Sequence, residues 1–359
     1  MIHFTLGPVE MYERTKAIGA LQNKYFRVPE FSAFVKEIDQ KLKQFLNVPT
    51  SYHTILLASS GTGAMEAALL NSFTPDDRAL IVNGGKFATY FIDICKCQGI
   101  PFDTVDVSFG ETLTIERLSS YEGKNYTALL VNIHETSTGQ LYDKTMLRDF
   151  CKRNNMYFIV DAISSVCADE LDVTKYDMDA VILSSQKGFA LPPGLGMVII
   201  SNRLYDEKIA NNKVRSLYFD FKSYVLNMER FQTPFTPALG ILYQLSDMLD
   251  YLLQVGPDRI IERTHGLAEY YRAWAHSFGL NVLSYPLSNA VTPVFLQDVS
   301  AFKVHTVLKE EYDIMVNPSA LFPDNLFLIG HLGNLTIKDY NVLTSVLETV
   351  FEDLRNEKQ

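Results

Sequence analysis

Short apolar segments alternate with amphipathic ones between about residues 54 and 201, and this alternation constrains the fold more than any other feature of the chain. Seven apolar runs rich in β-branched residues predict strands: Thr54–Ala58, Ala79–Val82, Thr104–Val107, Ala128–Asn132, Tyr157–Asp161, Ala180–Ser184 and Met197–Ser201. Predicted helices lie between them, among them Ala64–Phe73, Tyr90–Gln98 and Lys144–Asn154. Such alternation is typical of a mostly parallel sheet with right-handed crossovers and helices on both faces. The sequence therefore predicts an α/β domain with a mostly parallel seven-stranded sheet.

The pattern differs on both sides of this region. Residues 29–47 place apolar side chains on one face of an amphipathic helix. After residue 238, two long helices are predicted at Leu239–Val255 and Pro257–Phe278, the second beginning after a Gly-Pro pair. Further elements are predicted at Ala290–Leu296 and Leu326–Ile329 (strands) and at Val299–Glu311 and Ile337–Asn356 (helices). We predict a large α/β domain over residues 15–240 and a smaller α+β domain over residues 241–359, against which residues 1–14 pack.

Charge and composition narrow the class of protein. With 32 Lys and Arg against 42 Asp and Glu, the formal charge of the 359-residue chain is −10. An acidic balance argues against nucleic acid or an anionic membrane as the main partner. No apolar run approaches the ~18 residues that a membrane span needs, and residues 1–8 do not resemble a signal peptide. The expected location is the cytoplasm.

The four cysteines, Cys95, Cys97, Cys151 and Cys167, form no CxxC pair. They are too few for a disulfide scaffold. We expect buried, reduced thiols rather than metal ligands, because cysteine is among the most buried residue types. No metal site is predicted.

The carboxyl ends of the strands should carry the chemistry, because ligands of parallel α/β sheets bind there. Ser60, Gly61 and Thr62 follow the first strand and lead directly into a helix. Free backbone amides and the helix dipole at such a turn can bind a phosphate, although Ser-Gly turns also cap many helices. The polar segment His134–Gly139 follows the fourth strand and, taken alone, is typical of a capped loop.

Two charged residues end consecutive predicted strands. Asp161 closes Tyr157–Asp161, and Lys187 follows Ala180–Ser184, 187 − 161 = 26 residues later. They could form a structural salt bridge. They could instead belong to a pyridoxal phosphate site, in which Lys187 forms the Schiff base with the cofactor aldehyde and Asp161 keeps the pyridine nitrogen protonated. The turn at Ser60–Thr62 would then hold the phosphate, and the three signals together favour the cofactor.

In its motifs the chain resembles the class V branch of fold type I pyridoxal-phosphate aminotransferases, in particular the alanine–glyoxylate, serine–pyruvate and 2-aminoethylphosphonate–pyruvate transaminase group. The resemblance covers nearly the whole chain. The matching segments, in chain order, are Phe4-Thr5-Leu6-Gly7-Pro8, Arg27-Val28-Pro29-Glu30-Phe31, Ser60-Gly61-Thr62-Gly63-Ala64-Met65-Glu66-Ala67-Ala68, His134-Glu135-Thr136-Ser137-Thr138-Gly139, Val160-Asp161-Ala162-Ile163-Ser164-Ser165, Gln186-Lys187-Gly188, Pro192-Pro193-Gly194-Leu195-Gly196, Thr233-Pro234-Phe235-Thr236-Pro237 and Ile329-Gly330-His331-Leu332-Gly333.

The resemblance implies a role for several residues. It makes Lys187 the Schiff-base lysine and Asp161 the partner of the pyridinium nitrogen. Phe87 would stack on the cofactor ring, although a phenylalanine of the core is the alternative. Thr136 would bond near the phenolic oxygen and Gln186 would reach the phosphate. Thr236 would reach the phosphate from a neighbouring subunit, which implies a homodimer with sites at the interface.

The chain departs from the family at two places. Ala88-Thr89-Tyr90 stand where the family usually has Gly-x-Arg. Leu328 stands where the family has the arginine that clamps the substrate α-carboxylate, and leucine cannot make that bidentate contact. Arg27, Arg215 and Arg230 are alternative cations that the sequence does not rank. The loss of the arginine favours a substrate other than the usual small α-amino acids.

The resemblance implies a pyridoxal 5'-phosphate-dependent aminotransferase with a ping-pong Schiff-base mechanism. Its substrates would be a small amine or amino acid, including those that carry a phosphonate or phosphate, and a keto or aldehyde acceptor. A decarboxylase or lyase on the same scaffold is the alternative, because Leu328 removes the in-plane carboxylate clamp. A non-enzymatic protein that keeps the fold is disfavoured by the presence of both Lys187 and Asp161.

Overall fold

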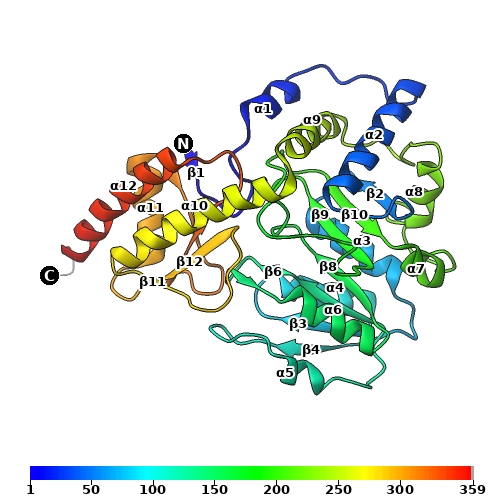
Figure 1. The fold of residues 1–359 in the computed structure, drawn as a ribbon, viewed down its shortest axis with the longest axis horizontal. Coiled ribbons are helices and arrows are strands. Elements are labelled where there is room, and N and C mark those ends of the chain that lie inside the picture. The colour runs from blue at the N-terminus through cyan, green and yellow to red at the C-terminus, as the bar shows by residue number, and fades with distance from the viewer. Residues whose placement is uncertain (357–359) are drawn as a thin grey trace.

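The computed structural model describes residues 1–356, and a seven-stranded sheet forms its centre (Figure 1). The strands are β2 (His53–Leu57), β3 (Ala79–Asn83), β4 (Phe102–Asp106), β5 (Ala128–Asn132), β8 (Tyr157–Asp161), β9 (Ala180–Ser184) and β10 (Gly196–Ile200). They lie side by side in the order β2-β10-β9-β8-β5-β3-β4. All neighbours are parallel except β10, which runs antiparallel to both β2 and β9. The prediction of a mostly parallel seven-stranded sheet is confirmed.

Helices cover both faces of this sheet, because successive side chains of a strand point to opposite faces. On β3, Leu80 and Val82 belong to one cluster of buried residues, whereas Ala79 and Ile81 belong to another. The first cluster includes side chains of α2 (Pro29–Phe45), α6 (Lys144–Arg153) and α9 (Leu239–Val255). The second includes those of α3 (Gly61–Ser72), α4 (Ala88–Gln98) and α8 (Phe221–Met228). Both faces are apolar, which explains the nearly continuous apolar runs of the strands.

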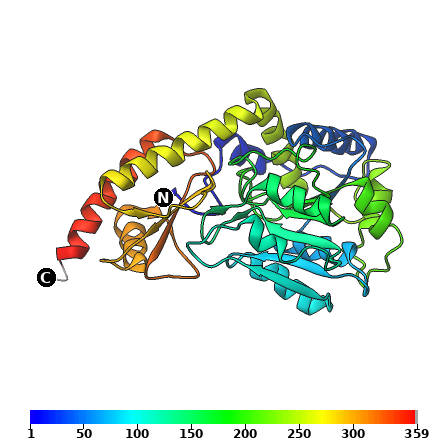
Figure 2. The same cartoon turned by 60° about the horizontal axis from the view of Figure 1, so that its bottom comes forward.

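A smaller part of the chain lies beside the sheet, joined to it by the long helix α10 (Pro257–Ser277), yellow in Figures 1 and 2. Its antiparallel sheet has the order β11-β12-β15-β14. These strands are β11 (Asn281–Val282), β12 (Val291–Phe295), β14 (Asn317–Pro318) and β15 (Leu326–Gly330). Helices α11 (Ala301–Tyr312) and α12 (Ile337–Asn356) pack with α10 in a third buried cluster.

The N-terminal residues pack against this smaller part, as the sequence predicted. Strand β1 (Ile2–His3) pairs in parallel with β13 (Ile314–Met315), and Phe4 is buried in the third cluster. The chain thus begins beside its C-terminal elements (Figure 1). The division into domains at residues 240 and 241 stays a prediction.

The predicted and observed boundaries of helices and strands agree best where the sequence has strong stop signals. Helices α9 and α12 have the predicted bounds, whereas α3 begins three residues before the predicted Ala64 because Ser60 caps it. The short elements were not predicted, since a few residues cannot display a period. They are α1 (Glu13–Gly19), α5 (Ile115–Ser119), β6 (His134–Glu135), β7 (Gln140–Leu141), α7 (Asn202–Leu204) and the π-helix η1 (Tyr205–Ile209), together with the strands β1, β11, β13 and β14.

All four cysteines are free, and three of them are buried. The expectation of burial is wrong for Cys97, which is exposed. It lies two residues after the buried Cys95 on α4, and this spacing places it on the far side of the helix. No helix within residues 1–356 is both long enough and apolar enough to cross a membrane.

Candidate active site

Six strands of the large sheet have their carboxyl ends at one edge, and a cavity lies there. It is lined by Ser60, Gly61, Thr62, Met65, Phe87, Tyr90, Thr136, Asp161, Ile163, Ser164, Gln186 and Lys187. These residues follow or end β2, β3, β5, β8 and β9. Every residue predicted for the site lines this cavity except Thr236, which is exposed elsewhere on the chain. The predicted contribution of Thr236 from a second subunit stays a prediction.

Lys187 lies in the connection between β9 and β10 and is only 8% exposed. Its Nζ donates a hydrogen bond to the carbonyl oxygen of Leu6 and lies 5.7 Å from the centre of the Phe87 ring. Burial lowers the pKa of Lys187 to about 8, and the nearby carboxylate of Asp161 opposes this shift. A primary amine that is half deprotonated at such a pH can act as a nucleophile or as a base.

Gly7, in the N-terminal motif Phe4–Pro8, packs against the side chain of Lys187. Gly7 has φ +131°, a conformation that side chains rarely adopt. A Cβ at Gly7 would lie 2.5 Å from Cδ of Lys187, so any larger residue would displace the amine. The sequence alone assigned no role to Gly7; only the folded chain brings residue 7 against residue 187.

Asp161 ends β8 and is held by two hydrogen bonds. Its Oδ1 accepts from the backbone amide of Ile163 at 2.8 Å, and its Oδ2 accepts from the side-chain amide of Asn132. Burial raises the pKa of Asp161 to about 6, and both hydrogen bonds oppose this shift. Within residues 1–356, Asp161 and Lys187 form no ion pair with each other. This geometry disfavours the alternative of a structural salt bridge.

The turn after β2 has backbone amides that are free to donate hydrogen bonds. Oγ of Ser60 accepts from the amide of Gly63 at 3.1 Å and caps α3. The amides of Gly61 and Thr62 have no acceptor in the described part of the chain. A Cβ at Gly61 would lie 2.6 Å from Cδ1 of Ile163, so this turn leaves no space for a side chain. Unpaired amides at a helix N-terminus are suited to a phosphate.

These observations match the needs of pyridoxal phosphate. Unpaired amides at the helix start suit its phosphate, a buried carboxylate suits its ring nitrogen, and a buried amine suits its aldehyde. The buried atoms Oδ1 of Asn132 and Nε2 of His134 also lack protein partners. Polar groups of this kind are costly to leave unpaired, so the residues fit a polar bound group.

Glu135 holds the loop that carries Phe87, a role that was not predicted. Its buried carboxylate accepts from the amides of Phe87 at 3.3 Å and Ala88 at 3.1 Å, at the start of α4. It also accepts from the amide and hydroxyl of Ser137. The only sequence signal was an acid within the polar segment after β5, and that signal does not reveal which amides it meets.

Neither Leu328 nor any of the alternative cations lines this cavity. Leu328 is buried in β15 between Pro293 of β12 and Asn317 of β14, in the cluster that continues into the large sheet. Arg27 donates to the carbonyl oxygens of Thr233 and Pro234. Arg215 and Arg230 are exposed. Among the described residues that line the cavity, Lys187 is the one cation.

Comparisons with known proteins point to one family of enzymes. The sequence pattern described as "Aminotransferase class-V" matches residues 10–318. The chain is 28% identical to the soluble hydrogenase 42 kDa subunit of Anabaena cylindrica, over 98% of this chain and 93% of that protein. It is also 28% identical to L-aspartate–glyoxylate aminotransferase of Paracoccus denitrificans, over 93% and 86%.

A solved structure shares the fold. Alanine–glyoxylate aminotransferase from a Nostoc species superposes with a TM-score of 0.92 at 23% identity, covering 98% of this chain and 95% of that one. Within residues 1–356, no group of three or more His, Cys, Asp or Glu side chains is placed to hold a metal ion.

Proposed function

The chain belongs to the class V aminotransferase family, and we propose that it transfers an amino group from a small amine or amino acid to a keto or aldehyde acceptor in ping-pong order. As a member of this family it is a pyridoxal-phosphate-dependent transferase. The observation that carries the proposal is the meeting of Lys187, Asp161 and the Ser60–Thr62 turn in one cavity.

The proposed roles follow from the position of each side chain. When bound, pyridoxal phosphate supplies an electrophilic aldehyde and a ring that accepts the electron pair of a breaking bond at the substrate carbon. The amides of Gly61 and Thr62, with Ser60 and Gln186, would bind the phosphate. Asp161 would accept a hydrogen bond from the ring nitrogen, and Phe87, whose loop Glu135 holds, would pack against the ring. Thr136, which lines the same cavity, would help to orient the ring.

Lys187 moves the proton. With pyridoxal phosphate and substrate bound, the neutral Nζ of Lys187 would serve as the base that takes a proton from the substrate carbon and as the acid that gives it back. Its buried position and its contact with the Leu6 carbonyl keep the amine in the cavity and away from water.

The pH dependence of cofactor attachment should report on this amine. A lysine whose pKa is lowered loses its proton as the pH rises through about 8, and only the neutral amine attacks an aldehyde. After removal of the cofactor, the enzyme should therefore bind pyridoxal phosphate covalently again at a rate that rises about tenfold per pH unit below about pH 8. Above about pH 8 this rate should level off. Stopped-flow absorbance measures this rate. A rate that keeps climbing to about pH 10 would indicate an ordinary surface lysine.

The proposed substrate class follows from charge. A carboxylate bound at this cavity within a single chain would meet Lys187 as its one cation, and Lys187 is needed for chemistry. A buried charge without a matched partner is costly. We therefore propose a donor without an α-carboxylate: a plain amine, which needs no clamp, or an aminoalkyl phosphonate or amino phosphate ester, whose anionic end needs a cation from outside this single-chain cavity. We also propose that a homodimer completes the site with Thr236 of the partner subunit.

A panel of donors tests the proposed function. The holoenzyme is mixed with 2-aminoethylphosphonate, phosphoethanolamine, a simple alkylamine, alanine and serine, and conversion of the cofactor to pyridoxamine phosphate is followed by absorbance and mass spectrometry. Conversion by a donor, reversed on addition of glyoxylate or pyruvate, is the expected result. Release of carbon dioxide without conversion would instead establish the decarboxylase alternative.

Replacing Leu328 with arginine should shift this preference. The substitution restores the family's clamp at a strand position that faces the large sheet, so half-transamination by alanine or serine, slow in the wild type, should become faster. Leu328→Met keeps the volume without the charge and should change nothing. Single-turnover rates for alanine and serine measure the effect. Efficient wild-type conversion of alanine with glyoxylate or pyruvate would show that another residue already holds the carboxylate.

A further inference from the structure

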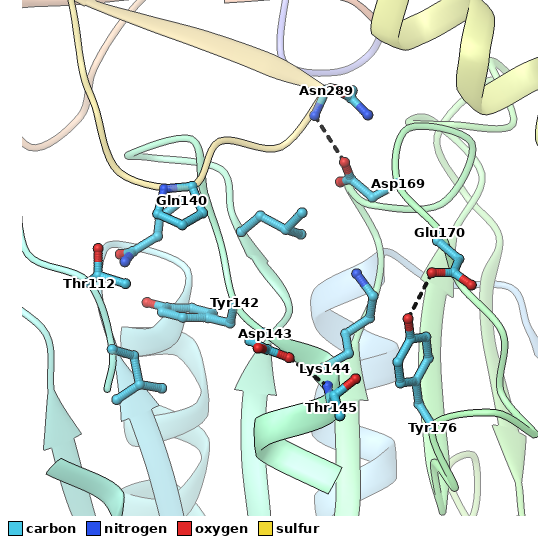
Figure 3. Close-up of a pocket in the computed structure, with 13 residues that line it drawn as sticks. Thr112, Gln140, Tyr142, Asp143, Lys144, Thr145, Asp169, Glu170, Tyr176 and Asn289 are labelled. Atoms are coloured by element: carbon cyan, nitrogen blue, oxygen red, sulfur yellow. Dashed lines mark hydrogen bonds between the residues drawn. The ribbon is translucent and has the colours of Figure 1, made fainter. Parts of the chain in front are cut away.

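A second cavity, of about 470 Å³, lies where α6 begins (Figure 3). It is lined by Thr112, Leu113, Gln140, Leu141, Tyr142, Asp143, Lys144, Thr145, Asp169, Glu170, Tyr176, Pro286 and Asn289. None of these residues lines the cavity of Lys187. Its volume is in the range of small-molecule sites.

The walls of this second cavity come from two parts of the chain that hydrogen bonds join. The amide of Leu141 donates to the carbonyl oxygen of Pro286 at 2.9 Å. Asp169 accepts from the Ser288 hydroxyl at 2.5 Å and from the Asn289 amide at 3.0 Å. The segment 286–289 that leads into β12 is thereby fixed against the large sheet domain, and the cavity is a preformed feature of the fold.

Lys144 is the unusual group in this cavity. It is 8% exposed, and Figure 3 shows its side chain extending into the cavity. Within residues 1–356 its ammonium makes no hydrogen bond and no ion pair, and its nearest recorded contact is the ring of Tyr176, 5.7 Å from Nζ to the ring centre. The buried Tyr142 hydroxyl also lacks a partner. The Lys144 side chain is mostly buried, while its Nζ is open to the cavity with three donors that no acceptor among the described residues uses, so an anionic group in the cavity could bind it.

The acids around Lys144 are already used elsewhere. Asp169 is bonded to residues 288 and 289, and Glu170 accepts from Lys175 and from the Tyr176 hydroxyl. Asp143 caps α6 through Oδ1, which accepts from the amides of Thr145 and Met146. Oδ2 of Asp143 has no hydrogen-bond partner among the described residues, and this residue is exposed at the mouth of the cavity.

The charges of the lining select one class of ligand. The ammonium of Lys144 would attract an anionic group. The carboxylates of Asp143, Asp169 and Glu170 would repel a purely anionic molecule, and a phosphate dianion most of all. A molecule with a carboxylate and an ammonium avoids this repulsion, because its carboxylate can meet Lys144 while its ammonium meets Oδ2 of Asp143.

We propose that this cavity is a second binding site, separate from the catalytic one, for a small zwitterionic amino acid whose carboxylate pairs with Lys144 and whose ammonium pairs with Asp143. The bound molecule bridges the start of α6 and the segment 286–289, the two parts of the chain that form the cavity.

Three probes of similar size test the proposal by isothermal titration calorimetry on the holoenzyme. They are α-aminoisobutyrate, which carries both charges and has no Cα–H bond to react, isobutyrate, which lacks the amine, and isopropylamine, which lacks the carboxylate. We expect α-aminoisobutyrate to bind without a change in cofactor absorbance, and at least about tenfold more tightly than either single-charge probe. Equal binding of isobutyrate would overturn the zwitterion assignment.

Variants locate the binding. Lys144→Met should weaken α-aminoisobutyrate at least about tenfold, and Asp143→Asn, which keeps a capping side chain, should weaken it without weakening isobutyrate. Lys152→Met is the matched control, because Lys152 is an exposed lysine on the same helix, paired with Asp177. It should bind like the wild type. Unchanged binding in Lys144→Met, or no binding of α-aminoisobutyrate to the wild type, would overturn the proposal.

The melting temperature gives an independent readout. Lys144→Met removes a charge that has no protein partner among residues 1–356 and leaves a side chain of similar length, so the variant should melt no lower than the wild type. A clearly lower melting temperature would mean that Lys144 has a structural partner, and the proposal would fail.

Discussion

Replacing Lys187 with alanine is expected to abolish turnover while leaving a folded protein that still binds pyridoxal phosphate without a covalent bond. The loss should be at least ~10³-fold, within the range attributed to a positioned acid–base group, because no other lysine lines the cavity. The fold should persist, since the Lys187 amine makes a single hydrogen bond, to Leu6, and removing it relieves the burial of a cation.

Turnover, cofactor absorbance and the elution volume of the protein measure these effects together. Lys96→Ala is a suitable control, because Lys96 is an exposed residue of α4 far from the strand ends. If the alanine variant at position 187 kept the absorbance band of covalently bound cofactor, another lysine would carry the bond and the assignment would be wrong.

Replacing Asp161 with asparagine should reduce the rate at least ~10²-fold, as when a key electrostatic group is removed. The amide cannot keep the ring nitrogen of the cofactor protonated, so the electron pair released at the substrate carbon is less well stabilised. Folding should suffer far less, because asparagine can still accept from the Ile163 amide. Single-turnover rates and urea unfolding separate the two effects.

Asp179 provides the control for that variant. It is also a buried acid of elevated pKa, and it accepts from the Phe158 amide and the Ser201 hydroxyl at the opposite edge of the sheet. Asp179→Asn should therefore lower stability without the loss of rate. Near-normal turnover in Asp161→Asn would show that Asp161 serves only the structure.

Much of the fold could be predicted because its signals are local. Each strand of the large sheet except the edge strand β4 is a mostly apolar run, and parallel strands imply that their carboxyl ends meet at one edge. From this rule alone, Asp161, Lys187 and the Ser60–Thr62 turn could be expected together, and they do line one cavity. The identity of the cofactor needed the resemblance to a family, since a lysine and an aspartate at strand ends also suit a salt bridge.

The remaining features depend on contacts between distant segments. Glu135 binds amides almost fifty residues earlier in the chain, and Gly7 meets Lys187 across 180 residues, so no spacing in the sequence reveals either contact. Lys144 looks like an ordinary first-turn residue of an amphipathic helix. Its burial becomes visible only in the folded chain, where Pro286 and Asn289 line the same cavity.

The position of cofactor attachment tests the central claim most directly. Borohydride reduces the bond between the cofactor aldehyde and a lysine amine to a stable one, and digestion followed by mass spectrometry then identifies the modified residue. We predict one modified lysine, Lys187. Modification of another lysine instead, such as the buried Lys144 or the neighbouring Lys86, would contradict the proposed site.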